Sequence, residues 1–208
     1  MGIVVRPAVP GDAPGLVATH VRSWQAAYQP FFSPDYLASL SEETESRIER
    51  WERIIASPDE EGSTTFVAVE DGRLTGFLGA GPARDEDVTE DAGEIYACYV
   101  DPSAWRKGTG SALMDRGTKY LRECGFVSAV LWVFEGNEMS RRFYEQHRWA
   151  PTSARHLFER AGCSIPEIRY RLDLEDRSLS GSGERDQLAE VVAPAVLDPI
   201  GHEDDATW

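Results

Sequence analysis

The sequence has few lysines and no long apolar run, and these two shortages exclude two classes of protein. Only two of its 21 cationic residues are lysines, and its formal net charge is −15. Proteins that bind nucleic acids normally carry a basic face, so this charge argues against that class. No stretch approaches the ~18 consecutive apolar residues of a membrane-spanning helix. We therefore expect neither a nucleic-acid partner nor a membrane association.

Cysteine is scarce as well, with three residues in a chain of 208. An odd number without the spacing of metal ligands predicts neither a disulfide framework nor a metal site. The first residues, MGIVVRPAVPGD, lack the charged start and the apolar stretch of a signal peptide. We therefore expect a reduced protein in the cytoplasm.

The chain does contain enough apolar residues for one packed core. Hydrophobic residues make up 41% of the 208 residues, a length typical of one domain with an appendage. We place the domain at residues 1–174. Residues 175–208 are acidic, begin with a Ser/Gly-rich linker and contain one apolar patch at 188–196. This tail is expected either to be disordered or to dock as a short helix.

Apolar periodicity predicts a mixed α/β domain with the order β-α-α-β-β-β-α-β-α-β-β. Asp12 is a candidate N-cap for the first helix, which Pro30 should end. Asp71-Gly72 suits the tight turn of a hairpin between the second and third strands. The run VSAVLWVF is too apolar to be half exposed, which predicts a central, parallel strand. In the helix that follows, Met139 and Phe143 are four residues apart and should form the buried stripe.

A glycine pair, Gly108-x-Gly110, follows Arg106 and Lys107 and precedes a helical run. A strand, a glycine turn and a helix N-terminus together make an anion site, because unpaired N–H groups point outward and glycine lets a phosphate approach. The pattern is neither GxxxxGK nor a complete GxGxxG, because Leu113 stands where the third glycine belongs. Taken alone, it is equally compatible with a simple packing turn.

Two longer segments, YVDPSAWRKGTGSALM and VLWVFEGNEMSRRFYEQHRW, together resemble the GCN5-related N-acetyltransferase (GNAT) family. The first matches the family's strand end before a proline and its glycine turn. The second matches an Asn followed by a helix with Phe-Tyr-Glu. The resemblance extends over residues 1–174. Two positions depart from the pattern, because Trp105 stands where the family has Gln or Arg, and Arg148 where it usually has glycine.

The resemblance implies acetyl transfer to an amine from acetyl-coenzyme A (acetyl-CoA), the co-substrate. It implies that the strand ending in ACYV separates from its neighbour, that the pantetheine arm pairs with backbone in this gap, and that the pyrophosphate lies at residues 106–111. The cofactor-binding residues implied in this way are Tyr99, Val100, Arg106, Lys107, Gly108, Thr109, Gly110, Ser111 and Asn137. Asn137 also suits the N-cap of the helix after it.

Two residues are candidates for catalysis. Tyr144 is expected beside the thioester sulfur, where its phenol would protonate the leaving thiolate. Glu94 begins the strand that borders the site and would be the base for the amine, although it could equally belong to the acidic loop before it. His20 is a weaker candidate for the base, because a histidine on an apolar helix face is more often a core residue. The candidates for acceptor binding are the aromatic residues Trp24, Tyr28, Phe31 and Phe32.

The predicted function is N-acetylation of the primary amine of a small molecule or an N-terminus by direct attack. Six acidic residues within 85–94 favour a cationic acceptor, although they could simply face water. A protein-lysine acetyltransferase, a non-catalytic acyl-CoA sensor and a binding module with an acidic docking tail remain alternatives. A peptide acceptor and a homodimer are also open, since no pattern in the sequence determines them.

Overall fold

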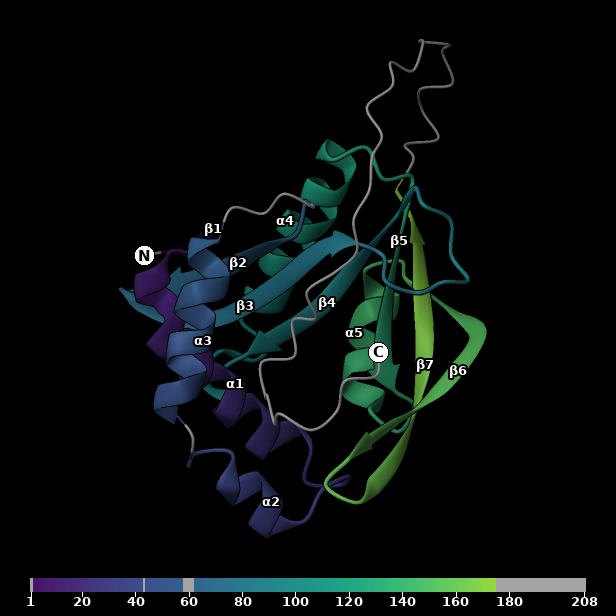
Figure 1. Ribbon diagram of the computed structural model, residues 1–208. Coiled ribbons are helices and arrows are strands. Elements are labelled where there is room, and N and C mark those ends of the chain that lie inside the picture. Colours follow the sequence, from purple (N-terminus) through teal and green to yellow (C-terminus); the bar gives the residue numbers. More distant parts are fainter. Residues whose placement is uncertain (1, 43, 58–61, 175–208) are drawn as a thin grey trace.

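The computed structural model describes residues 2–42, 44–57 and 62–174 (Figure 1). The predicted tail, residues 175–208, lies outside them. The helices are α1 (Ala13–Ala27), α2 (Pro34–Ser39), α3 (Thr44–Ala56), α4 (Thr109–Glu123) and α5 (Glu138–Gln146). The strands are β1 (Val4–Pro7), β2 (Thr64–Glu70), β3 (Arg73–Pro82), β4 (Ala92–Val100), β5 (Ser128–Phe134), β6 (Ala150–Arg160) and β7 (Cys163–Asp173).

The strands form one seven-stranded sheet in the order β1-β2-β3-β4-β5-β7-β6. All neighbours are antiparallel except β4 and β5, which are parallel. Helices α1, α2 and α3 cover one face of the sheet with one apolar cluster, and α4 and α5 cover the other face with a second (Figure 1). This confirms the predicted mixed α/β fold and the internal position of the strand VSAVLWVF, which is parallel to β4, as predicted, but antiparallel to its other neighbour, β7.

β4 and β5 stay together only where they begin. Their pairing covers Ala92–Glu94 on β4 and Ser128–Val130 on β5. Shortly beyond, β4 carries a bulge at Tyr96, which has no partner in the β3 register although both its neighbours have one. A bulge bends its strand and increases the local twist. The two strands therefore diverge toward their ends, and α5 lies beside the widening gap (Figure 1).

The turn between β2 and β3 is formed by Asp71 and Gly72, as predicted. Their φ angles are +50° and +76°. Two successive residues with positive φ match the right-handed twist of a tight hairpin. Ala161 and Gly162 repeat this arrangement between β6 and β7, with φ of +51° and +72°. Both hairpins are therefore closed by local backbone geometry.

Asp12 occupies the N-cap position of α1, as predicted, but its side chain does not bond the first turn of the helix. Its carboxylate accepts hydrogen bonds from the Arg6 guanidinium at 2.6 and 2.8 Å and from the Val9 amide at 2.8 Å. A short 3-10 turn, Pro10–Asp12, therefore precedes α1. The cation at position 6 competes for the carboxylate, which the sequence pattern around residue 12 does not reveal.

A further helix, α2, follows the break at Pro30 and is not predicted by the apolar periodicity. Ser33 caps it, because its Oγ accepts a hydrogen bond from the Tyr36 amide at 3.2 Å. Pro34 occupies the first helical position, where its missing N–H costs nothing. Ser-Pro thus starts a short helix between the two longer ones.

The buried side of α5 also differs from the prediction. Met139 is 53% exposed, whereas Tyr144 is the buried residue of the helix. Because α5 lies beside the diverging strands, the flank that carries Tyr144 packs on the sheet and Met139 points away from it.

No helix in the described part of the chain combines the length and apolar character needed to cross a membrane.

Candidate active site

The glycine turn opens α4. Gly108 precedes the helix and has a left-handed φ of +93°, which glycine adopts without strain. The first N–H groups of the helix, from Thr109 onward, have no carbonyl within the helix to bond. Arg106 and Lys107 lie directly before them, and both are exposed. The turn therefore offers the N–H donors and the cationic side chains of an anion site.

Gly110 has a packing role in the same turn. A Cβ at this position would lie 3.3 Å from two ring carbons of Phe143 on α5. The missing side chain therefore lets α4 and α5 approach one another. At Gly108, by contrast, the space that a side chain would occupy is open. The packing interpretation thus holds for Gly110, whereas Gly108 is required by backbone conformation.

A buried carboxylate holds the segment that leads into this turn. Asp101 is 2% exposed and accepts hydrogen bonds from Arg22 of α1 at 2.6 Å and Arg73 of β3 at 2.7 Å. The amide and hydroxyl of Ser103 also donate to it. Burial by itself would raise the pKa of Asp101, but the hydrogen bonds from Ser103 and Arg22 outweigh burial and lower it to about 2. The end of β4 is thereby tied to α1 and β3.

The two departures from the family pattern have structural explanations. The indole N–H of Trp105 donates to the Val100 carbonyl at 2.7 Å, so this side chain turns back onto the end of β4. Arg106 follows it and remains exposed. Arg148 has a φ of +67°, the left-handed conformation that a glycine would adopt. The turn after α5 therefore keeps its shape without the glycine.

The edge of β4 that faces the gap suits an extended ligand. Tyr99 and Val100 lie beyond the last β4 residue that pairs with β5, and their register partners in β3 are Phe77 and Gly76. The backbone edge toward β5 is therefore not used by the sheet, and such an edge can pair with another extended chain. This fits the pantetheine arm, whose two amides need backbone partners.

Tyr144 lies on the gap side of α5 and is 9% exposed. Burial raises its pKa well above the usual value for tyrosine, and the neighbouring Cys98, Tyr99 and Glu167 raise it further. The phenol therefore remains protonated at physiological pH and can donate a hydrogen bond into the gap. The same shift makes it a weaker acid than an exposed tyrosine.

Tyr28, directly after α1, reaches the same region from the opposite face of the sheet. Burial raises its pKa, and so do Tyr99 and Tyr144, with a hydrogen bond to the Tyr99 side chain among the causes. Three phenols, one directly after α1, one in β4 and one in α5, thus gather where the strands diverge. Cys98 lies there too, and burial raises the pKa of its thiol to about 12. A thiol with that pKa is neutral at pH 7 and a poor nucleophile.

Glu94 is buried in β4 and does not belong to the solvated loop, since it is only 2% exposed. Its oxygens accept hydrogen bonds from the Arg84 guanidinium at 2.6 and 3.1 Å and from the Arg84 amide at 3.0 Å. Burial would lower the pKa of Arg84, but the pairing with Glu94 raises it. Glu94 also lies in the part of β4 that still pairs with β5. The structure thus makes it an ion-pair partner, and its role as a base stays a prediction.

The acidic loop before Glu94 is held by side chains of β5 and β7. Asp85 and Asp87 both accept hydrogen bonds from Arg169 of β7, and Asp85 also accepts one from the Trp132 indole at 3.0 Å. These two carboxylates therefore neutralise an arginine and are not free to attract a cationic acceptor.

Among the described residues, no group of three or more His, Cys, Asp or Glu is placed to hold a metal ion.

The four aromatic candidates for acceptor binding separate into two groups. Trp24 and Phe32 are each 4% exposed and stack in the core with ring centroids 5.6 Å apart. Trp24 therefore packs in the core, whereas Phe32 also lines a second cavity of about 570 Å³ between α1 and α2, and an acceptor role for either residue stays a prediction. Phe31 instead lines a cavity of about 600 Å³. Tyr28 adjoins it, with its ring centroid 6.1 Å from that of Phe31.

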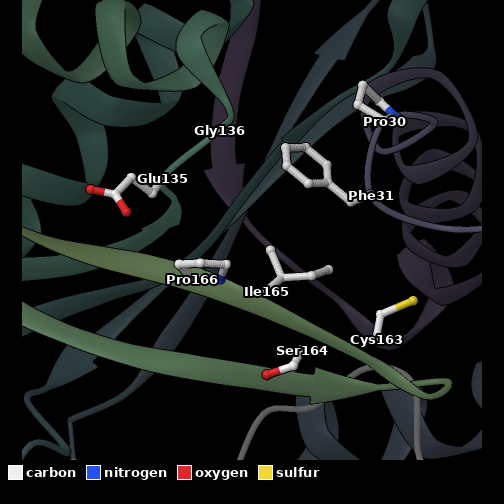
Figure 2. Close-up of a pocket in the computed structure, with 8 residues that line it drawn as sticks. All are labelled: Pro30, Phe31, Glu135, Gly136, Cys163, Ser164, Ile165 and Pro166. Atoms are coloured by element: carbon white, nitrogen blue, oxygen red, sulfur yellow. The ribbon is translucent and has the colours of Figure 1, made fainter.

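This cavity lies between the loop after α1, the end of β5 and the hairpin of β6 and β7. Figure 2 shows the Phe31 ring on one side and Ile165 and Pro166 on the other. The carboxylate of Glu135 is directed away from Phe31 in the same view. Because β5 ends here, the cavity is at the same end of the sheet as the divergence of β4 and β5.

Two further residues of the motifs, and His20 of α1, have structural partners. Asn137 caps α5, since its Oδ1 accepts a hydrogen bond from the Ser140 amide at 3.1 Å, which confirms the N-cap prediction. Glu145 accepts one from the buried Tyr170 hydroxyl at 2.8 Å and so ties α5 to β7. His20 is fully buried, with its Nδ1 2.9 Å from Arg47. Burial, and then nearby arginines, lower its pKa, so it is a neutral core residue, as expected.

Sequence reasoning missed a pair of polar residues on the last hairpin. Glu167 and His156 face each other across β6 and β7, with Glu167 Oε2 and His156 Nε2 2.6 Å apart. The one available signal was the alternation of Glu167 and Arg169 with the buried Ile168 and Tyr170. Alternation assigns the charged residues to the opposite face of the strand from the buried ones, but it does not reveal which side chains of other elements they contact there.

Comparison with known proteins agrees with this geometry. Residues 21–148 match the sequence model of the Acetyltransferase (GNAT) family. YuaI, an uncharacterized N-acetyltransferase of Bacillus subtilis, is 34% identical over 168 residues, which cover 80% of this chain and 90% of YuaI. A spermidine N(1)-acetyltransferase of Thermoplasma acidophilum is 23% identical over 144 residues, 69% of this chain and 86% of that one.

A solved structure shows the same fold. It is that of the acetyltransferase yncA from Salmonella typhimurium with acetyl-CoA, which superposes with a TM-score of 0.62 at 20% identity and covers 88% of this chain and 100% of that one. The family match spans more than half of this chain, and a relative above 30% identity spans most of it. The chain therefore belongs to the GNAT family and is an N-acetyltransferase that uses acetyl-CoA as its co-substrate.

Proposed function

We propose that the protein acetylates the primary amine of a small, cationic molecule by direct attack on the thioester of acetyl-CoA. The observation that carries this proposal is the gap between β4 and β5, which Tyr144 borders. The gap lies between the glycine turn that follows β4 and the cavity that adjoins the end of β5. One site can thus hold the two substrates from opposite sides of the sheet.

The proposed co-substrate site consists of the glycine turn and the free edge of β4. Residues 106–111 would bind the pyrophosphate through backbone N–H groups, supported by Arg106 and Lys107. Backbone groups of Tyr99 and Val100 would hold the pantetheine arm, and Asn137 would lie near it. Bound there, acetyl-CoA supplies an activated acetyl group as a thioester.

The proton balance of the reaction explains why Tyr144 matters. An ammonium ion and a thioester give an amide, a thiol and one released proton, so the nitrogen loses two protons and the sulfur gains one. Tyr144 is the proposed donor to the departing sulfur, a thiolate with an ordinary pKa of about 8.5 by analogy with cysteine. Burial raises the pKa of Tyr144 above the usual tyrosine value, which makes the phenol a weak acid. The main effect of Tyr144 is therefore a hydrogen bond that stabilises the thiolate.

Direct attack is favoured over an acetylated enzyme by the state of Cys98. Cys98 is among the groups that raise the pKa of Tyr144, and its own pKa of about 12 keeps the thiol protonated. A nucleophilic cysteine needs the opposite, a lowered pKa that populates the thiolate. The acceptor amine is therefore the proposed nucleophile.

A small acceptor is supported by the cavity and by the relatives. A volume of about 600 Å³ lies within the roughly 300–1,000 Å³ typical of small-molecule sites. The spermidine N(1)-acetyltransferase among the relatives is named for a polyamine, a small molecule with primary amines.

The three cysteines are all free thiols, which supports a reducing compartment such as the cytoplasm.

The test is release of free thiol from acetyl-CoA in the presence of a panel of polyamines, amino sugars, amino acids and a lysine peptide. Turnover with small amines and not with the peptide supports the proposal. Binding of acetyl-CoA without thiol release would instead support a sensor. Tyr144→Phe should lower kcat by about 10²-fold while the affinity for acetyl-CoA stays unchanged. Tyr120→Phe is the matched control, because that hydroxyl lies near the C-terminal end of α4, opposite to the glycine turn, and donates to the Gly62 carbonyl.

A further inference from the structure

Glu167 of β7 lies on the acceptor side of the gap. In the sheet register it is the neighbour of Phe134, the last residue of β5, and of His156 on β6. Its side chain is on the same face as Ile165, two residues before it, which packs in the cluster under α1. Phe134 also contacts Tyr28, with ring centroids 4.9 Å apart. Glu167 is thus on the face from which an acceptor would approach.

The Glu167 carboxylate is nearly buried, but only one of its oxygens is bonded. The side chain is 13% exposed, and Oε2 is 2.6 Å from Nε2 of His156. No hydrogen bond from any described residue reaches Oε1. A carboxylate that loses its water needs hydrogen bonds or an opposite charge in return. Oε1 therefore has the capacity to bind one more N–H donor.

The charges around Glu167 leave its negative charge available. Arg169 is two residues along on the same face, but Asp85 and Asp87 hold its guanidinium at 2.9 and 2.8 Å. His156 contacts the Oε2 atom of Glu167 through its Nε2, which leaves Oε1 to a different donor. This face of the hairpin is therefore suited to a cation.

Glu167 is also close enough to the reaction region to matter there. After burial, it is among the groups that raise the pKa of both Tyr144 and Tyr28. The residue before it, Pro166, lines the cavity opposite Phe31 (Figure 2). Glu167 follows this lining residue without lining the cavity itself, so a ligand held there can extend one end toward Glu167.

We propose that Glu167 binds the ammonium group of the acceptor through Oε1 and takes the proton that must leave before attack. This role of Glu167 rests on the proposed function, because it requires an amine acceptor. It also restricts the acceptor to a primary alkylammonium whose apolar part contacts Phe31. An N–H bond of the ammonium breaks and an O–H bond forms at Oε1. The freed lone pair forms the C–N bond, and the C–S bond breaks with its electrons on sulfur, which takes a proton from Tyr144. The second proton of the nitrogen returns to Tyr144 through solvent, and the carboxyl of Glu167 releases its own proton to water.

Two other carboxylates near the gap are less suited to this role. Glu94 accepts three hydrogen bonds from Arg84, so a cationic acceptor would have to displace an arginine. Glu135 lines the cavity, but its carboxylate points away from Phe31 and lies 3.3 Å from the guanidinium of Arg155 (Figure 2). Glu167 alone among these three has no arginine partner in the described part of the chain.

The test is Glu167→Gln, assayed with a cationic amine that the wild-type protein acetylates and with an analogue fluorinated beside the nitrogen, which is uncharged at pH 7. For the cationic amine we expect kcat/KM to fall about 100-fold or more, the usual scale for loss of a general base. For the uncharged analogue, which has no proton to give up before attack, we expect a fall of less than about 5-fold. Calorimetry should show unchanged affinity for acetyl-CoA.

Two further variants complete the experiment. Glu167→Asp keeps the charge but shortens the side chain, so it should retain about tenfold more activity than Glu167→Gln on the cationic amine and still lose more on that amine than on the uncharged analogue. Glu159→Gln is the matched control, because Glu159 is an exposed residue of the same hairpin whose carboxylate bonds Ser164, and it should stay within about twofold of wild type. If Glu167→Gln does not bind acetyl-CoA, the comparison of the two amines is made with Glu167→Asp.

An equal loss on both amines, or near-wild-type activity on the cationic one, would overturn this assignment while the proposed function stands. A selective loss in Glu94→Gln, absent in Glu167→Gln, would also overturn it and move the role to Glu94. If the wild-type protein releases no thiol with any amine, the proposed function fails, and the assignment of Glu167 fails with it.

Discussion

Asp101 is the residue whose replacement should reveal how the fold holds the co-substrate turn. Asp101→Asn keeps the shape of the side chain and one carbonyl oxygen for the Ser103 amide, but it removes the charge that pairs with Arg22 and Arg73. The carboxylate is 2% exposed, so solvent screens this charge little, although the two arginines are 44% and 55% exposed. The variant therefore tests an electrostatic anchor with little change in packing.

The expected magnitude follows from the pKa of Asp101. In an unfolded chain an aspartate has a pKa of about 3.9, whereas in the folded protein it is about 2. At about 1.4 kcal/mol per unit, the ionised form stabilises the folded state by about 2.5 kcal/mol. Because the folded-state pKa is the lower one, this contribution is fully present above about pH 5 and is lost as pH falls through about 4 toward 2. It should correspond to about 5–10 °C in Tm.

Urea unfolding of wild type and Asp101→Asn at several pH values is the appropriate assay. At pH 7 the free energy of unfolding of the variant should be lower by about 2.5 kcal/mol. The difference between the two proteins should shrink toward zero as pH approaches 2, which separates Asp101 from all other carboxylates. Asp115→Asn, an exposed position on α4, is the control and should change stability by less than about 0.5 kcal/mol.

Two results would refute the reasoning about Asp101. One is a stability of Asp101→Asn within about 0.5 kcal/mol of the Asp115→Asn control at pH 7. The other is a difference from wild type that stays the same between pH 7 and pH 2, since a loss of packing alone does not titrate. Either outcome would mean that the hydrogen-bond geometry, and not the charge, holds the end of β4.

Three more predictions concern the turn, the tail and the thiols. Gly108→Ala must place a side chain at φ +93°, so we expect its affinity for acetyl-CoA, measured by calorimetry, to fall about tenfold or more. Arg106→Ala should lower that affinity less, because the backbone donors remain. Truncation after Leu174 should leave Tm and acetyl-CoA binding unchanged, because that residue is buried beside a sheet that ends at Asp173, and a large drop in Tm would show that the tail packs on the domain. Iodoacetamide at pH 8 should label exposed Cys124 much faster than Cys98, whose thiol has a pKa of about 12, and equal rates would contradict that shift.

The sequence by itself determined the features that depend on neighbours along the chain. The turn residues Asp71-Gly72, the glycine at position 108 and the cap Asn137 have these roles because of backbone conformations and bonds within a few residues. The apolar run of β5 predicts a strand buried on both faces for the same local reason. The order of elements, and with it the resemblance to the family, therefore follows from residue types and their spacing alone.

The tertiary structure alone decided which polar side chains meet. Asp101 owes its low pKa in part to Arg22, 79 positions away in the sequence, and Arg169 is neutralised by Asp87, 82 positions away. Glu167 acquires its place beside Phe134 only through the β5–β7 register, which no local pattern specifies.

The aromatic residues after α1 illustrate the same limit. Trp24 and Phe31 are equally apolar in sequence, yet one fills the core and the other lines the cavity. Local conformation is governed by torsion angles and short-range bonds, which residue types reveal. Pairing between distant segments depends on how the sheet twists, bends at the β4 bulge and packs its helices, and these depend on the whole chain at once.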